Sequence, residues 1–144
     1  MSDQDTMLDP DLASGFAAFE AKNFSQAMRM LMKFAEQGDA DAQHRVAIMY
    51  QNGLGVVASD EQAYKWMKAS AEQGYPIAQH GLGFMYLEGE CVEQNSEEAI
   101  KWFKAAAEQG LIGSMTTLAM MYEEGRGVDK DPEEAQRLYK LAGF

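Results

Sequence analysis

The sequence predicts an all-α fold built from repeated pairs of antiparallel helices. The first observation is a repeat of 36 residues, because Tyr50, Tyr86 and Tyr122 recur at this step and residues 38–73 match residues 74–109 at 17 of 36 positions. The second is composition, since only three prolines interrupt a chain rich in the helix formers Ala, Glu, Gln and Lys. The third is the spacing of the apolar residues, which follows one face of a helix in each repeat.

The repeat divides the chain into four units of one predicted domain. A chain of 144 residues is long enough to bury roughly 68–70% of its unfolded surface, so its core needs no disulfide. The expected divisions are a flexible N-terminus at 1–7 and a single repeat domain at 8–144, composed of a helical hairpin at 8–38, full repeats at 39–74 and 75–110, and a truncated repeat at 111–144.

The helices can be placed in order along the chain. In the first unit, residues 12–20 form one predicted helix and Ser25 to Gln37 the next, with a short loop between them. In the first full repeat, small and apolar residues recur on one face from about Asp41 to Asn52. Gly53 then ends this helix, because glycine readily takes the left-handed conformation that follows a helix. The same pattern returns in both later repeats.

The second helix of each repeat begins at a capping pair. A Ser, Asn or Asp side chain can accept a hydrogen bond from the backbone N–H three residues later, where Gln or Glu is favoured. The pairs are Ser59 with Gln62, Asn95 with Glu98 and Asp131 with Glu134. Pro132 falls at the first helical position, where the missing N–H costs nothing. Trp66 and Trp102 lie at helix-face spacing and are expected to wedge into the core.

Composition disfavours several classes of partner and location. The net charge of −11 disfavours nucleic acid and anionic membrane surfaces, both of which carry phosphates. No stretch approaches the roughly 18 apolar residues of a membrane-spanning helix. Residues 1–5 lack the basic and apolar regions of a signal peptide. We therefore expect a cytoplasmic location, or a periplasmic or secreted one if a leader has been removed.

Catalytic and metal-binding motifs are weak, so the sequence predicts no enzyme, no cofactor and no metal. No glycine-rich phosphate loop follows a strand, and the carboxylates follow helix caps and exposed faces. Cys91 is the only cysteine, which rules out an intramolecular disulfide and a thiolate cluster. His44 and His80 occupy equivalent positions, but a shared zinc would need a further carboxylate, and repeat copying explains the pair more simply.

The repeat resembles the Sel1-like repeat family, a subclass of tetratricopeptide-like proteins. The motif in the first full repeat is Tyr50-x-x-Gly53-x-Gly55-Val56, then Ala63-x-x-Trp66, then Ala71-Glu72-Gln73-Gly74. The resemblance covers about residues 38–142, and the hairpin at 8–38 fits the tetratricopeptide-like pattern loosely. There are two departures. Cys91 replaces the second loop glycine, which predicts a different backbone conformation there, and Leu138 replaces the tryptophan.

The resemblance implies a right-handed α/α superhelical solenoid of antiparallel helix pairs, with the first helices on its concave face. It also implies an adaptor or scaffold that binds another protein. Two alternatives remain. One is β-lactam binding or hydrolysis, which has been linked to a cysteine-rich branch of the family. The other is self-assembly, including a homodimer through the C-terminal helix, where Leu138, Leu141 and Phe144 are expected to be partly exposed.

Partner-binding residues are expected in the concave groove, where ligand peptides contact tetratricopeptide-like domains. These positions are His44, Arg45, Ile48, Gln51, Asn52, His80, Phe84, Leu87, Glu88, Thr116, Met120, Glu123 and Glu124. An apolar row of Ile48, Phe84 and Met120 beside acidic Glu88, Glu123 and Glu124 would suit a peptide or helix with apolar and basic residues. Alternatively, the apolar side chains pack between neighbouring helices and the glutamates form an ordinary solvated surface.

Overall fold

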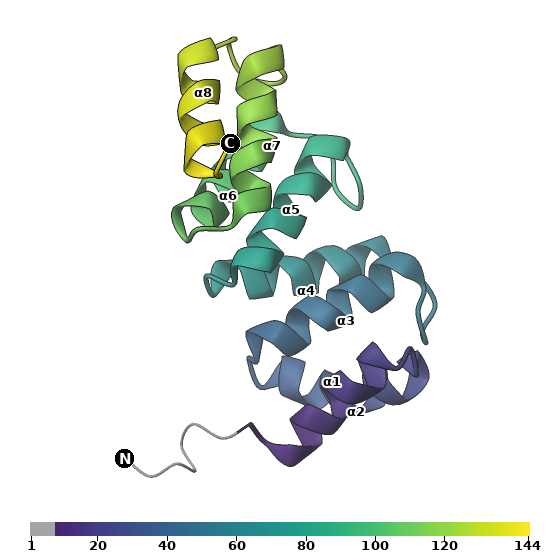
Figure 1. The fold of residues 1–144 in the computed structure, drawn as a ribbon. Coiled ribbons are helices and arrows are strands. Elements are labelled where there is room, and N and C mark those ends of the chain that lie inside the picture. Colours follow the sequence, from purple (N-terminus) through teal and green to yellow (C-terminus); the bar gives the residue numbers. More distant parts are fainter. Residues whose placement is uncertain (1–7) are drawn as a thin grey trace. The chain divides into compact units, whose positions relative to one another are not determined.

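The predicted all-α fold of repeated helix pairs is confirmed in the computed structural model, which describes residues 8–144 (Figure 1). The predicted flexible N-terminus, residues 1–7, lies outside the described residues. Eight helices and no strand occur over residues 8–144: α1 (Pro10–Glu20), α2 (Phe24–Glu36), α3 (Ala40–Asn52), α4 (Asp60–Glu72), α5 (Pro76–Glu88), α6 (Ser96–Glu108), α7 (Ile112–Glu124) and α8 (Pro132–Leu141). None of these helices has the length and apolar character that a membrane span requires.

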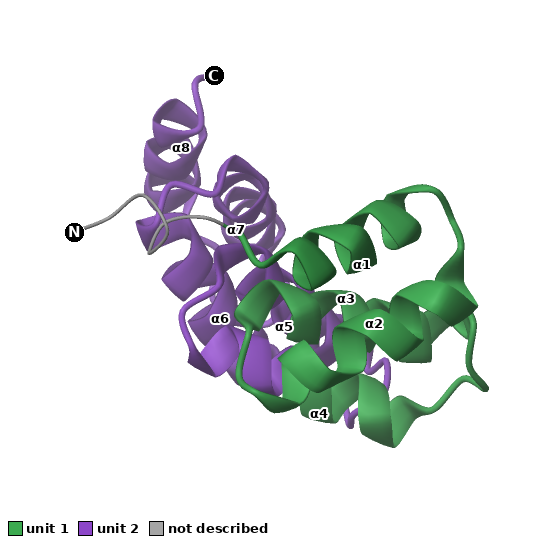
Figure 2. Ribbon diagram, turned by 90° about the horizontal axis from the view of Figure 1, so that it is seen from below, with its two compact units in different colours: residues 1–66 green, residues 67–144 purple. Residues whose placement is uncertain are grey.

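The chain forms two compact units, residues 1–66 and residues 67–144, which are described separately as the N-terminal unit and the C-terminal unit (Figure 2). The boundary between them falls within α4. In the N-terminal unit, α2 packs against both α1 and α3. In the C-terminal unit, α6 packs against both α5 and α7, and α7 packs against α8. Successive helices therefore form the packing pairs within each unit.

The core of the N-terminal unit is built on the apolar faces of α1, α2 and α3. Leu31 of α2 and Met49 of α3 are fully buried. Gly15 brings α1 close to α2, because a Cβ atom at this position would lie 2.6 Å from Cδ2 of Leu31. The small residue in α1 thus makes room for a large side chain from α2, which allows the two helices to pack closely.

The core of the C-terminal unit gathers side chains from α5, α6, α7 and α8. Its buried members are Leu87, Ala99, Ile100, Phe103, Leu118, Ala119, Met121 and Leu138. Phe103 is the central aromatic residue, and it is fully buried. Gly83 of α5 allows the ring to approach the helix, since a Cβ atom there would lie 2.7 Å from Cε1 of Phe103.

The predicted capping pairs and helix-ending glycines are present. The Ser59 hydroxyl accepts a hydrogen bond from the backbone N–H of Gln62 at 3.2 Å. The side chains of Asn95 and Asp131 accept the equivalent bonds from Glu98 and Glu134 at 3.2 and 3.1 Å. The glycines that follow the first helices take left-handed φ values of 66–71°: Gly53, Gly89 and Gly125. These local signals mark the ends of α3, α5 and α7 and the starts of α4, α6 and α8.

The backbone at Cys91 differs from the sequence prediction. The prediction is a changed loop conformation where cysteine replaces glycine, but Cys91 takes a φ of 68°, close to the 71° of Gly55 and the 73° of Gly127. The prediction was therefore wrong. An L-residue tolerates this region at a cost of roughly 1–2 kcal/mol. The repeated loop thus keeps its conformation despite the substitution.

A repeated glutamine hydrogen bond links the end of one repeat to the start of the next. The side-chain amide of buried Gln43 donates to the carbonyl of Ala35 at 3.0 Å. Gln79, its equivalent in the next repeat, donates to the carbonyl of Ala71 at 3.3 Å. Each bond pairs a buried amide with a carbonyl near a helix end, so neither polar group carries a desolvation penalty.

Candidate functional site

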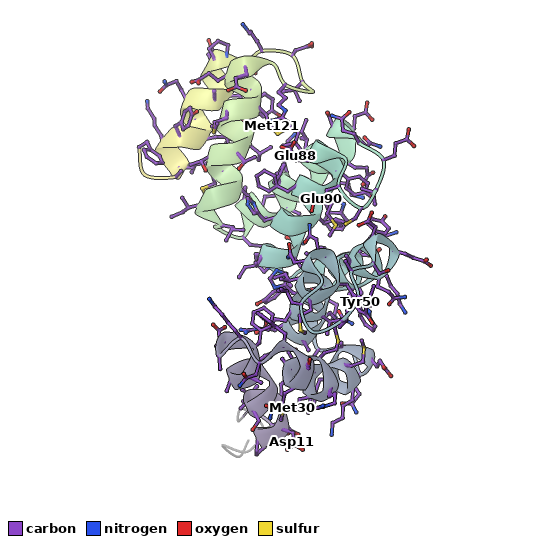
Figure 3. All side chains as sticks on the ribbon, turned by 90° about the vertical axis from the view of Figure 1, so that its right-hand side faces the viewer. Asp11, Met30, Tyr50, Glu88, Glu90 and Met121 are labelled. Carbon is purple, nitrogen blue, oxygen red and sulfur yellow. The ribbon has the colours of Figure 1, made fainter. Side chains whose placement is uncertain are left out.

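The first helices α5 and α7 of the C-terminal unit carry the candidate site, and side chains connect them near both ends. Near their N-terminal ends, Nδ1 of His80 and the hydroxyl of Ser114 share a hydrogen bond of 2.7 Å. Near their C-terminal ends, Arg126 donates to the carboxylate of Glu88 at 3.3 Å. Figure 3 shows Glu88 near the end of α5, with Glu90 in the loop that follows. These two connections hold α5 and α7 side by side.

An aromatic cluster lies beneath the exposed side of α5. The rings of His80, Phe84 and Phe103 contact one another edge to face, with centroids 4.9–5.4 Å apart. This geometry is favoured because the edge of one ring is positive and the face of the next is negative. Phe84 is therefore held from below by a buried ring and a hydrogen-bonded imidazole, while part of its own ring stays in contact with solvent.

The exposed part of this region is apolar with an acidic end, and we call it the α5–α7 surface. Phe84 and Met120 occupy equivalent positions on the two helices and expose 36% and 50% of their surface. The glutamates Glu88, Glu123 and Glu124 are exposed near the C-terminal ends of the same helices. Arg126 compensates the charge of Glu88, so Glu123 and Glu124 supply the negative charge. Apolar side chains beside negative charge suit a basic, apolar partner.

The two threonines of α7 in this region make hydrogen bonds within their own helix. The hydroxyls of Thr116 and Thr117 both donate to the carbonyl of Gly113, at 3.0 and 2.8 Å. Both threonines are half-buried. The predicted site residue Thr116 is thus present near the surface with its hydroxyl already engaged, and it contributes less to the chemistry of the surface than Phe84 or Met120.

The sequence places Leu87 on the binding face, but the structure buries it. Leu87 exposes only 3% of its surface and belongs to the core with Phe103 and Leu118. The physical reason is that α5 is apolar around most of its circumference, so the core takes residues that the helical period alone does not assign to it.

Arg45 of the N-terminal unit also has a structural role that sequence reasoning missed. Its guanidinium group contacts the carboxylates of Glu20 at 2.7 Å and Asp41 at 2.9 Å. The same group stacks over the rings of Phe16 and Phe19, at 4.5 and 5.0 Å from their centroids. Cation–π contacts and ion pairs of this kind join α3 to α1. Arg45 therefore stabilises the unit in which it lies.

The other predicted site residues of the N-terminal unit lie along α3. His44, Ile48 and Gln51 are half-buried, and Asn52 is exposed. The Asn52 amide donates to the carbonyl of Ile48 at 3.1 Å. Because these residues belong to the N-terminal unit, they form a separate set from the α5–α7 surface, and the site is built here from the C-terminal residues alone.

Metal binding has no cluster to support it in the described part of the chain. Over residues 8–144, no three His, Cys, Asp or Glu side chains come close enough together to hold a metal ion. The hydrogen bond of His80 to Ser114 and its contacts with Phe84 and Phe103 give this histidine a packing role.

Lowering the pH below about 6.5 is expected to destabilise the C-terminal unit. Burial lowers the pKa of His80 from its ordinary value of 6.5, so the unfolded chain takes up a proton that the folded chain resists. The stability contribution is complete above pH 6.5 and is lost as the pH falls below it. Urea unfolding at several pH values measures this loss.

Two variants test this pH dependence: the single variant His80→Gln and the double variant His80→Gln with His44→Gln. Burial also lowers the pKa of His44, so each substitution is expected to reduce the dependence of stability on pH between 7 and 5.5. A wild-type unfolding free energy that rises as the pH falls from 7 to 5.5 contradicts this account.

Comparison with known proteins identifies the repeat. A family model described as Sel1 repeat matches residues 17–39, 40–75, 76–111 and 114–143. A search of curated proteins found no match.

Two solved structures are similar over nearly the whole chain. The Sel1 repeat protein from Oxalobacter formigenes has a TM-score of 0.86 and 34% identity, and the match covers 94% of this chain and 54% of that one. A protective antigen of uropathogenic Escherichia coli with an SLR fold has a TM-score of 0.86 and 38% identity, covering 92% of this chain and 29% of that one. This chain thus spans about half of the first protein and less than a third of the second. The predicted Sel1-like α/α solenoid fold class is confirmed.

Proposed function

Because the chain belongs to the Sel1 repeat family, we propose that it is a non-enzymatic adaptor that binds a partner protein through the α5–α7 surface. Proteins of this family are generally non-catalytic scaffolds for protein interaction. The proposal for this chain adds a location for the partner and a chemistry for its contact surface.

The observation that carries the proposal is the exposure of Phe84 and Met120 at equivalent positions of adjacent helices. Large apolar side chains that gather on a surface are typical of interaction sites, because water solvates them poorly. Phe84 is also pre-ordered by its contacts with His80 and Phe103, so little side-chain entropy is lost when a partner covers it. A rigid aromatic residue of this kind is a typical interface hot spot.

The charge of the surface indicates the partner. Glu123 and Glu124 are exposed and the chain carries a net charge of −11, so an acidic partner is repelled and a basic one is attracted. We infer a peptide or helix that places an apolar side chain against Phe84 and Met120, with Lys or Arg beside it. Such a partner matches both the apolar and the acidic parts of the surface.

The test is affinity capture from a native lysate with the double variant Phe84→Ala and Glu124→Lys. The matched control is Val57→Ala with Glu61→Lys, which also removes one exposed apolar side chain and reverses one exposed charge, but in the N-terminal unit. The expected result is that wild type and control capture the same protein, and that the double variant loses about tenfold or more of it. Circular dichroism confirms that both variants fold.

Equal capture by all three proteins contradicts the proposed surface. Loss of capture in the control variant alone would place the partner on the N-terminal unit instead. The salt dependence gives a second measurement, because an acidic surface binds a basic partner less tightly as ionic strength rises.

A further inference from the structure

A pocket of about 430 Å³ opens between α6, α7 and α8, and it shares no residue with the α5–α7 surface. Its apolar wall includes Met115, Leu118 and Tyr122 of α7 with Leu138 and Leu141 of α8. This volume is in the range of pockets that bind small ligands, roughly 300–1,000 Å³. The pocket therefore needs an explanation of its own.

The pocket lies where the repeat has lost its tryptophan. Trp66, Trp102 and Leu138 occupy equivalent positions in three successive repeats, and both Trp66 and Leu138 are buried. An indole is much longer than the side chain of leucine, and Leu138 lines the pocket, so we attribute part of the open space to the shorter side chain at this position. Unfilled apolar space loses dispersion contacts and favours an apolar guest.

The rim of the pocket is acidic. The carboxylates of Glu108, Asp131 and Glu134 line it together with the cations Lys104 and Arg137. Arg137 donates to both carboxylate oxygens of Glu134, at 3.0 and 3.1 Å from Nε, so its charge is already compensated. The remaining charges at the rim are the carboxylates of Glu108 and Asp131 and the ammonium group of Lys104. They carry a net negative charge, so a cationic group on a bound partner is favoured at the rim.

We propose that this pocket binds a tryptophan side chain of a partner protein that carries Lys or Arg next to it. The indole lies in the pocket against Leu141 and Tyr122, and the neighbouring cation faces Glu108 and Asp131. A partner that binds only the α5–α7 surface leaves this pocket empty, so failure of one proposal does not contradict the other.

The experiment titrates the capped peptide Lys-Trp-Lys into the full chain labelled with 15N. The expected result is saturable shifts in the amide resonances of residues that line the pocket. Capped Lys-Ala-Lys is expected to give no saturable shift. Capped Glu-Trp-Glu is expected to bind at least about fivefold more weakly, because its charges meet the acidic rim.

Two variants test the location. Leu138→Trp restores the repeat's residue and fills the pocket, so we expect a raised Tm and at least a tenfold loss of peptide affinity. Leu141→Ala removes an apolar wall residue that is 57% exposed, so it should fold normally and bind several-fold more weakly. The control Phe84→Ala changes the other surface and is expected to leave peptide binding unchanged.

Three outcomes overturn the proposal. The first is no saturable shift with Lys-Trp-Lys, and the second is equal affinity in wild type and a folded Leu141→Ala variant. The third is an occupant of another kind. Tighter binding of free tryptamine than of the peptide would indicate a small-molecule site, and pocket shifts that grow with protein concentration alone would indicate a second copy of this chain.

Discussion

Replacing Phe103 with alanine is expected to lower the unfolding free energy of the C-terminal unit by about 3–5 kcal/mol. Phe103 is fully buried and contacts the rings of His80 and Phe84. Its removal opens a cavity that α5 cannot fill, because the facing residue is Gly83, which has no side chain. Urea unfolding followed by circular dichroism measures the loss.

The matched control for this prediction is Trp102→Ala. Trp102 is the preceding residue of α6 and a larger side chain, but it is only partly buried, so we expect a smaller loss of stability despite the greater number of atoms removed. An equal or larger loss in the control would mean that burial in the Phe103 cluster does not set the stability of this unit.

Replacing Gly55 with alanine is expected to destabilise the N-terminal unit by about 2–5 kcal/mol, from backbone strain and overpacking together. Gly55 has a left-handed φ of 71°, and a Cβ atom there would lie 2.5 Å from the carbonyl carbon of Phe24 and 2.6 Å from the nitrogen of Ser25. Both of these are backbone atoms at the start of α2. They cannot rotate away as a side chain can, so the loop or the helix must move.

Gly53→Ala is the control that separates strain from collision. Gly53 has a similar φ of 66°, but the nearest atom to an added Cβ is the Cβ of Ala58 at 3.4 Å, an ordinary contact. We expect this variant to lose only the strain energy, about 1–2 kcal/mol. If thermal unfolding shows the same loss of stability for Gly55→Ala and Gly53→Ala, the close approach of the loop to α2 does not contribute to the effect.

The local features of the fold could be predicted from the sequence because each depends on few neighbouring residues. The capping bonds of Ser59, Asn95 and Asp131 join residues three apart, and the glycine turns depend on backbone preference alone. Repetition of these signals at a fixed step makes the pattern readable without any knowledge of tertiary contacts.

The errors arose where distant packing decides the outcome. Leu138 is predicted to be partly exposed, but it exposes only 4% of its surface because α6 and α7 supply the apolar partners. Cys91 keeps the glycine conformation in a loop that the same backbone hydrogen bond closes in each repeat, here from the N–H of Asn95 to the carbonyl of Tyr86. Neither outcome follows from the identity of the residue alone.

Part of the candidate site could be predicted from the helical period, which indicates the residues of a helix that face solvent. Phe84 and Met120 lie on the surface as the helical period indicates. The period does not predict Ser114, Phe103 or Arg126, which hold the site in place through contacts between helices. It also assigns Arg45 to a partner, whereas Glu20 and two aromatic rings of α1 already engage this side chain.

The pairing of successive helices has a consequence for synthesis on the ribosome. Each newly made helix of the N-terminal unit packs against the helix that emerged just before it, as α2 does with α1 and α3 with α2. Contacts of short sequence separation form quickly because little loop entropy is lost. Nascent chains can thus acquire their hairpins one after another during translation, and apolar surface is covered soon after it leaves the exit tunnel.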